Sequence, residues 1–143
     1  MFEFHGWINI WAGDPDETTH ADVEAAIAAI RVRAQEAEAA IGCWFEVRVT
    51  FNEQIVLVAH GLRNHPQDEP LAVFRWVAER YPMSYGLLYV HNQWDVPRNN
   101  EFVVYRLAHG LVTEFSDSLL SPFVPTVDDG LDPEQRRGRT AGT

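Results

Sequence analysis

Hydrophobic and polar side chains alternate strictly at the start of the chain. In residues 2–11 (FEFHGWINIW) one side of an extended chain would carry Phe2, Phe4, Gly6, Ile8 and Ile10. The other side would carry Glu3, His5, Trp7, Asn9 and Trp11. Because successive side chains of a strand point to opposite faces, the pattern predicts a strand with one strongly apolar face.

A helix is expected next, after the polar loop 12–19. Thr19 followed by Asp22 has the spacing of a capping box, and Gly42 is a typical residue just past a helix end. Apolar residues between them recur at helical spacing: Val23, Ile27, Ile30, Ala34 and Ile41.

Two strands follow, over 44–51 and 54–60, and the tight Asn52-Glu53 turn between them predicts a hairpin. Asp68 is placed to cap a second helix, with Pro70 in its first turn, and Tyr81-Pro82 ends it. The apolar stripe of this helix comprises Leu71, Phe74, Val77 and Ala78. Three further strands are expected over 84–91, 101–108 and 111–115.

The order β-α-β-β-α-β followed by two strands predicts an α+β fold. It matches a ferredoxin-like βαββαβ core with an antiparallel sheet, two helices on one face and a C-terminal β-hairpin. We expect one domain over 1–129, in which 121–129 packs along the body as an extended segment. The remaining tail, 130–143, should be disordered.

Composition narrows the function. The chain has 143 residues with 46% hydrophobic and 12% aromatic residues, typical of one ordered globular domain. No apolar run approaches the ~18 residues of a membrane span, and the N-terminus does not resemble a signal peptide, so we expect a cytoplasmic protein. Its single cysteine, Cys43, excludes an internal disulfide and predicts a small buried residue.

The formal charge of −10 disfavours nucleic acid and membrane surfaces as partners, because both require local positive potential. The same charge would speed encounter with a basic partner. All eleven basic residues are arginine, which excludes Schiff-base chemistry and a lysine-bearing phosphate loop.

The stretch HGLRNH (60–65) resembles catalytic machinery but lacks the partners that catalysis needs. We interpret it as a connection shaped by Gly61 and Pro66, because no HExxH motif or Cys/His cluster accompanies it and no metal site is expected. No serine lies in an elbow-like turn. A small hydrolase that uses His60, His65 and a carboxylate remains an alternative.

The polar side of the first strand suggests a surface with aromatic side chains. His5, Trp7 and Trp11 would share it with Trp44 and Arg48 of the next strand, and with the acids Glu3 and Glu46. Exposed aromatics can stack nucleic-acid bases, but those surfaces are basic. The tryptophans would be ordinary core if the C-terminal strands or 121–129 covered them. If exposed, they resemble a protein-interaction hot spot.

Several stretches, in order, resemble the immunity protein 7 (Imm7) family of bacterial polymorphic toxin systems: EFHGWINI, HGLRNH with FRWVAERYP, SYGLLYVHNQWD, NEFVVYRLAHG and DSLLSPFVPTVDD. The likeness spans 2–129. It implies a non-enzymatic immunity protein without cofactor that binds and blocks a cognate toxin. An acidic inhibitor suits a basic nuclease-type toxin, whose cleft is built for phosphate.

We therefore expect stoichiometric occlusion of the toxin by a chain that is monomeric when unbound. The expected partner-binding residues are acids and tryptophans of the loops and the open sheet face: Trp7, Trp11, Asp14, Asp16, Glu17, Trp94, Asp95, Asp117, Asp128 and Asp129. A small-ligand-binding regulatory module is the alternative, and it would show a pocket between helix and sheet.

Overall fold

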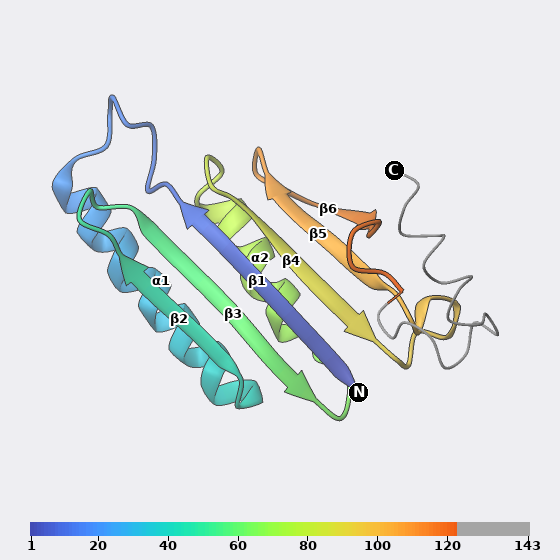
Figure 1. The fold of residues 1–143 in the computed structure, drawn as a ribbon. Helices are drawn as coiled ribbons and strands as arrows, with labels where there is room; N and C mark the ends of the chain where they lie inside the picture. Colours follow the sequence, from blue (N-terminus) through green and yellow to red (C-terminus); the bar gives the residue numbers. More distant parts are fainter. Residues whose placement is uncertain (123–143) are drawn as a thin grey trace.

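The computed structural model describes residues 1–122 as a six-stranded sheet with two α-helices (Figure 1). The elements in chain order are β1 (Phe2–Ile10), α1 (His20–Ile41), β2 (Trp44–Val49), β3 (Ile55–Arg63), α2 (Glu69–Arg80), β4 (Tyr85–Asn92), the short 3-10 helix η1 (Val96–Arg98), β5 (Phe102–Ala108) and β6 (Leu111–Ser116). The predicted α+β class, with an antiparallel sheet and two helices, is confirmed.

The sheet has the strand order β2-β3-β1-β4-β5-β6, and every neighbouring pair is antiparallel. The N-terminal strand β1 is therefore central, between β3 and β4. Figure 1 shows α1 and α2 together behind the sheet, on the same face. The opposite face is covered by neither helix, and it is called the open face below.

The core lies between the sheet and the helices because the apolar side of β1 faces them. Phe4 and Ile8 are fully buried there, as is Phe74 of α2. Burial of such large side chains is worth about 1.5–3 kcal/mol each. The alternating pattern at the N-terminus therefore sets which face of the sheet carries the core.

Helix α1 begins and ends as the sequence predicts. The backbone N–H of Thr19 donates to the Asp22 carboxylate at 2.8 Å, and the backbone N–H of Asp22 donates to the Thr19 hydroxyl at 3.2 Å, which completes the capping box. Gly42 takes the left-handed conformation, with φ of 62°, and its N–H donates to the Glu38 carbonyl at 2.8 Å.

Helix α2 starts at the predicted place, but Asp68 does not cap it with its side chain. Its carboxylate makes no capping hydrogen bond; only its backbone carbonyl accepts from the Ala72 N–H, at 3.0 Å. Pro70 lies in the first turn, where its missing N–H needs no partner. The helix ends at Arg80, just before Tyr81.

The stretch HGLRNH is not the connection that the sequence suggested. Strand β3 continues through Arg63, because its last residues pair with the start of β1: His60 lies opposite His5, and Arg63 opposite Phe2. Gly61 does not bend the chain. It leaves room for the core, because a Cβ there would lie 2.5 Å from the Cys43 Sγ and 2.6 Å from the Phe4 Cε1.

The β2–β3 hairpin is confirmed, but its turn is wider than predicted. Strand β2 ends at Val49, and Phe51 is fully exposed in the turn, not aligned with the buried face of the strand. The Thr50 N–H donates to the Gln54 carbonyl at 2.9 Å, so Thr50 and Gln54 close the turn. Glu53 at its tip has a positive φ of 59°.

Two predictions concern residues outside the described range. They are the disordered tail over 130–143 and, beyond Pro122, the extended segment ending at 129. Within residues 1–122, neither α-helix is long and apolar enough to cross a membrane.

Candidate partner-binding surface

The open face carries exposed aromatic side chains on three strands. Trp7 of β1 is 42% exposed, Tyr85 of β4 is 46% exposed and Trp44 of β2 is 51% exposed. The Trp7 and Tyr85 rings meet edge to face at a centroid separation of 6.1 Å. Residues 1–122 thus leave Trp7 and Trp44 accessible. Of the two interpretations from the sequence, a protein-interaction surface fits these exposures better than ordinary core.

A chain of polar contacts also crosses this face. The Glu3 carboxylate lies 2.6 Å from His5 Nε2, and His5 Nδ1 lies 2.6 Å from His60 Nδ1. The Trp44 and His60 rings pack edge to face at a centroid separation of 6.3 Å. Sequence reasoning missed this cluster because it ended the strand at His60 and interpreted 60–65 as a connection, whereas the β1–β3 register sets His60 beside His5.

The two histidines of HGLRNH do not come together as a catalytic pair. His60 contacts His5 and Trp44 on the open face, whereas His65 stacks on Trp94 at a centroid separation of 5.8 Å. In the part of the chain from Met1 to Pro122, no group of three or more His, Cys, Asp and Glu side chains is arranged to hold a metal ion.

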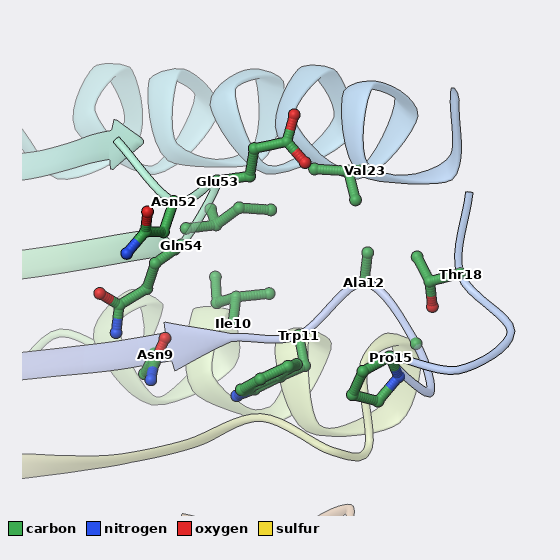
Figure 2. Close-up of a pocket in the computed structure, with 12 residues that line it drawn as sticks. Asn9, Ile10, Trp11, Ala12, Pro15, Thr18, Val23, Asn52, Glu53 and Gln54 are labelled. Carbon is green, nitrogen blue, oxygen red and sulfur yellow. The ribbon is translucent and has the colours of Figure 1, made fainter. Parts of the chain in front are cut away.

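A pocket of about 420 Å³ opens where β1 ends (Figure 2). Its walls come from the end of β1, the 11–18 loop, the start of α1 and the β2–β3 turn. The lining residues are Asn9, Ile10, Trp11, Ala12, Gly13, Pro15, Thr18, Val23, Asn52, Glu53, Gln54 and Ile55. Figure 2 shows the Trp11 ring along one wall, between Asn9 and Pro15.

Two buried polar residues hold the β1 side of this pocket in place. The backbone N–H of Trp11 donates to the hydroxyl of Ser84, a buried residue, at 3.1 Å. The Asn9 carboxamide nitrogen donates to the Tyr85 hydroxyl at 2.6 Å. Asn9 is only 6% exposed, and its Oδ1 has no hydrogen-bond partner among the described residues.

The pocket edge is acidic. Asp14, Asp16 and Glu17 are exposed in the loop that follows Trp11. The Asp14 carboxylate accepts from the Asp16 N–H at 2.9 Å, and its carbonyl accepts from the Glu17 N–H at 3.0 Å, so the loop has a defined turn. The outer carboxylates of Asp16 and Glu17 are therefore presented to solvent by a fixed backbone.

The start of α1 adds further acids beside the loop. His20 lies 2.8 Å from the Glu53 carboxylate and 3.3 Å from that of Glu24, and so links α1 to the β2–β3 turn. Hydrogen bonds from the Thr19 side chain and backbone lower the pKa of Asp22, which stays charged at neutral pH.

Trp94 and Asp95 lie at the opposite end of the sheet. They follow β4, whose last residue pairs with Phe2, the first residue of β1. The Trp94 indole N–H donates to the Asn64 carbonyl at 3.2 Å, and Asp95 forms an ion pair with Arg98 at 2.8 Å. The structure thus does not bring these two residues together with Trp7, Trp11 and the acidic loop.

The carboxylate of Asp117 is used within the chain. It accepts from the backbone N–H of Leu119 at 2.9 Å and of Leu120 at 2.8 Å, and from the Ser121 hydroxyl at 2.8 Å. Partial burial alone would raise the pKa of Asp117, but these hydrogen bonds outweigh it and lower the pKa. Asp128 and Asp129 lie outside the described residues.

These features define a small α+β domain with an aromatic open face and a pocket with acidic residues at its edge at one end of the sheet. The model of the family Immunity protein 7 (Imm7) matches residues 1–129, and the chain belongs to this family. The resemblance seen in the sequence is thereby confirmed. Membership implies an immunity protein of a toxin system, which binds a cognate toxin protein. No curated protein and no solved structure matches the chain.

Proposed function

We propose that this immunity protein neutralises a basic, nuclease-type toxin in the cytoplasm by occupying its surface in a one-to-one complex. The observation that carries the proposal is the acidic edge of the tryptophan-lined pocket at the end of β1. Asp16 and Glu17 are exposed there, and His20 at the start of α1 already lies against Glu53 and Glu24.

Charge and aromatic surface would act at different stages of binding. With a net charge of −10, the chain attracts a basic toxin from a distance, and the acids of the 14–17 loop orient it. Trp7 and Trp11 then supply apolar area that loses water in the complex and slows dissociation. Trp94 and Asp95 would contact only a toxin that spans the whole sheet.

The same surface is poorly suited to nucleic acid. Within residues 1–122, two arginines lie on the open face: Arg48 of β2 forms an ion pair with Glu46 of the same strand, and Arg106 of β5 packs over the Phe115 ring. Glu3 adds a further acid on β1. Aromatic surfaces that bind RNA or single-stranded DNA need unpaired positive charge around the rings, because phosphate contacts dominate affinity.

We also interpret the first four strands, in the order β2-β3-β1-β4 with both helices on one face, as a ferredoxin-like βαββαβ core. The pair β5–β6 then extends this core as the C-terminal hairpin. In this proposal the chain has no catalytic activity, needs no cofactor and is monomeric before it meets the toxin.

Co-expression with the toxin domain encoded beside this gene tests the proposal. We expect growth rescue and one-to-one binding at nanomolar affinity or tighter, about −12 kcal/mol, by calorimetry. A matched measurement with the toxin's nuclease assay should show loss of activity in proportion to the inhibitor added. Rescue without a complex, or turnover of toxin by catalytic amounts of the chain, would contradict stoichiometric occlusion.

A further inference from the structure

Two histidines on the open face direct a ring nitrogen at each other. His5 of β1 lies directly opposite His60 of β3 in the register of the sheet, and their Nδ1 atoms are 2.6 Å apart. At this separation one proton lies between the two nitrogens, donated by one ring and accepted by the other. Without that proton both lone pairs would point at the same place, where a cation could bind to both rings.

Glu3 sets the orientation of His5. Its carboxylate lies 2.6 Å from His5 Nε2, and because an ionised carboxylate only accepts, the Nε2–H of His5 donates to it. In the neutral imidazole this leaves the lone pair on Nδ1, directed at His60. Metal-ligating histidines commonly donate their other N–H to a carboxylate, which fixes the ring and makes the ligating nitrogen more basic. His5 is therefore oriented as a ligand.

His60 can supply the second lone pair because its side chain is exposed. Its proton has only to move from Nδ1 to Nε2, a change of tautomer that solvent can mediate and that leaves the ring neutral. Two Zn–N bonds of about 2.0–2.1 Å at a tetrahedral angle would place the nitrogens about 3.3 Å apart, so the rings must separate by less than about 1 Å. The His5 side chain is 38% exposed, so both rings have room to rotate by this amount.

Aromatic rings border the histidine pair on both sides. Trp44 packs edge to face on His60, and the centroid of the buried Phe102 ring lies 6.4 Å from that of His5. These contacts restrict the two imidazoles, whereas the solvent side of the sheet remains open to water. The strands thus hold two nitrogen ligands close together and leave further coordination positions free.

We infer that His5 Nδ1 and His60 Nδ1 bind a divalent transition-metal ion such as Zn²⁺, with Glu3 holding His5 in position and water completing the coordination. Imidazole suits Zn²⁺, whereas Mg²⁺ and Ca²⁺ prefer oxygen ligands. Structural zinc sites have four protein ligands, so a site with two binds its ion reversibly and folds without it. Two ligands agree with the finding that residues 1–122 contain no group of three or more that could hold a metal. The site is independent of the proposed function, which needs no metal.

Calorimetric titration of the full, untagged chain with Zn²⁺ tests the site. Excess Mg²⁺ in the buffer occupies exposed carboxylates, so the titration reports imidazole ligands. We expect saturable binding of one ion per chain. His5→Gln and His60→Gln should each weaken it about tenfold or more, because each leaves a single ligand. Glu3→Gln keeps both imidazoles and should weaken it about tenfold.

His65→Gln is the matched control. His65 is also an exposed histidine that contacts a tryptophan, since it stacks on Trp94 beyond the end of β3. Its replacement should leave the affinity for Zn²⁺ within about twofold of the original chain. Absence of saturable binding by the original chain, undiminished binding by His60→Gln, or an equal loss in His65→Gln would each overturn the inference. Undiminished binding by Glu3→Gln would overturn the orienting role of Glu3.

Two further measurements identify the atoms and exclude misfolding. The imidazole ¹⁵N resonances of Nδ1 in both His5 and His60 should move together as Zn²⁺ is added, and those of His65 should stay. Movement of Nε2 in place of Nδ1 would overturn the inference. Because an ion that binds only the folded state raises the Tm, Zn²⁺ should raise the Tm of the original chain and of His65→Gln but not that of His60→Gln. Thermal unfolding without metal shows that each variant is folded.

Discussion

Asp117 stabilises the turn after β6 through its carboxylate. Asp117→Asn removes the charge and one acceptor oxygen while three donors converge on the site. We expect a loss of about 1 kcal/mol at neutral pH, discounted for the partial exposure of the side chain. Denaturant unfolding of both proteins measures it, with Glu36→Gln as a control for loss of one surface charge.

The pH dependence of this loss follows from the lowered pKa of Asp117. The folded state binds the proton less tightly than the unfolded chain, in which aspartate has a pKa of about 3.9. The contribution is therefore complete above that pH and is lost as the pH falls through the folded-state pKa. The difference between the original chain and Asp117→Asn should shrink from about pH 7 to about pH 3, and a constant difference would refute the assignment.

Cys43 illustrates a residue whose role the sequence predicted correctly. It is buried, and burial raises the pKa of its thiol, an effect that the charge of Arg63 offsets only in part. The thiolate is the reactive species, so iodoacetamide should modify the folded protein far more slowly than the protein in denaturant. Mass spectrometry over time gives both rates. Comparable rates would mean that Cys43 is accessible and reactive.

At the level of elements, the substitution Gly61→Ala tests how closely β3 packs on the core. Gly61→Ala would place a methyl group against Cys43 and Phe4, and overpacking of this kind costs about 1–3 kcal/mol. Leu62→Ala, an exposed neighbour on the same strand, should change stability by less than about 0.5 kcal/mol. Adding Cys43→Ala to Gly61→Ala should restore part of the loss. A neutral Gly61→Ala would show that the strand has room to move.

The first turn of helix α1 is held by the Thr19/Asp22 capping box. Thr19→Ala removes the hydroxyl side of the capping box and should cost about 1 kcal/mol in thermal or denaturant unfolding. Thr113→Ala, an exposed threonine in β6, is the matched control. If the Thr19→Ala variant has the same unfolding free energy as the original chain, the capping box at the start of α1 does not stabilise the helix.

The order of the elements could be predicted because it depends on local patterns. Alternation in 2–11, the Thr19/Asp22 cap and the Asn52-Glu53 turn each determine a neighbouring structure without help from distant residues. The length of β3 could not be predicted, because Arg63 is a strand residue only through pairing with Phe2. The same long-range pairing places His60 beside His5. It also makes 60–63 part of a strand, so the interpretation of HGLRNH as a connection was wrong.

At the level of the whole molecule, the candidate site was predicted in part. Trp7, Trp11 and the acidic loop are near one another because all belong to β1 or directly follow it. Trp94 and Asp95 lie at the other end because β4 runs antiparallel to β1. The pocket itself could not be inferred from sequence, since Asn9 of β1 and Glu53 of the β2–β3 turn are distant in the chain and both line it.

If the acidic residues at the pocket edge steer the toxin, then the position of the negative charges, and not only the net charge, should set the association rate. Asp16→Lys with Glu17→Lys reverses two charges at the edge, whereas Glu36→Lys with Glu38→Lys makes the same change in net charge on the exposed side of α1. Asp14 is kept, because its carboxylate holds the loop. If local charge steers the toxin, the first pair should slow association about tenfold at low salt, and the second should have a much smaller effect.

Ionic strength separates steering from contact energy. Screening weakens attraction between exposed charges beyond about 8–10 Å at physiological salt, so the association rate of the original chain should fall steeply as salt rises. For Asp16→Lys with Glu17→Lys this dependence should flatten, while the dissociation rate, set by Trp7 and Trp11, should change little. Stopped-flow association over a salt series measures both. Equal slowing by the two lysine pairs would assign the steering to net charge and remove the 14–17 loop from the binding site.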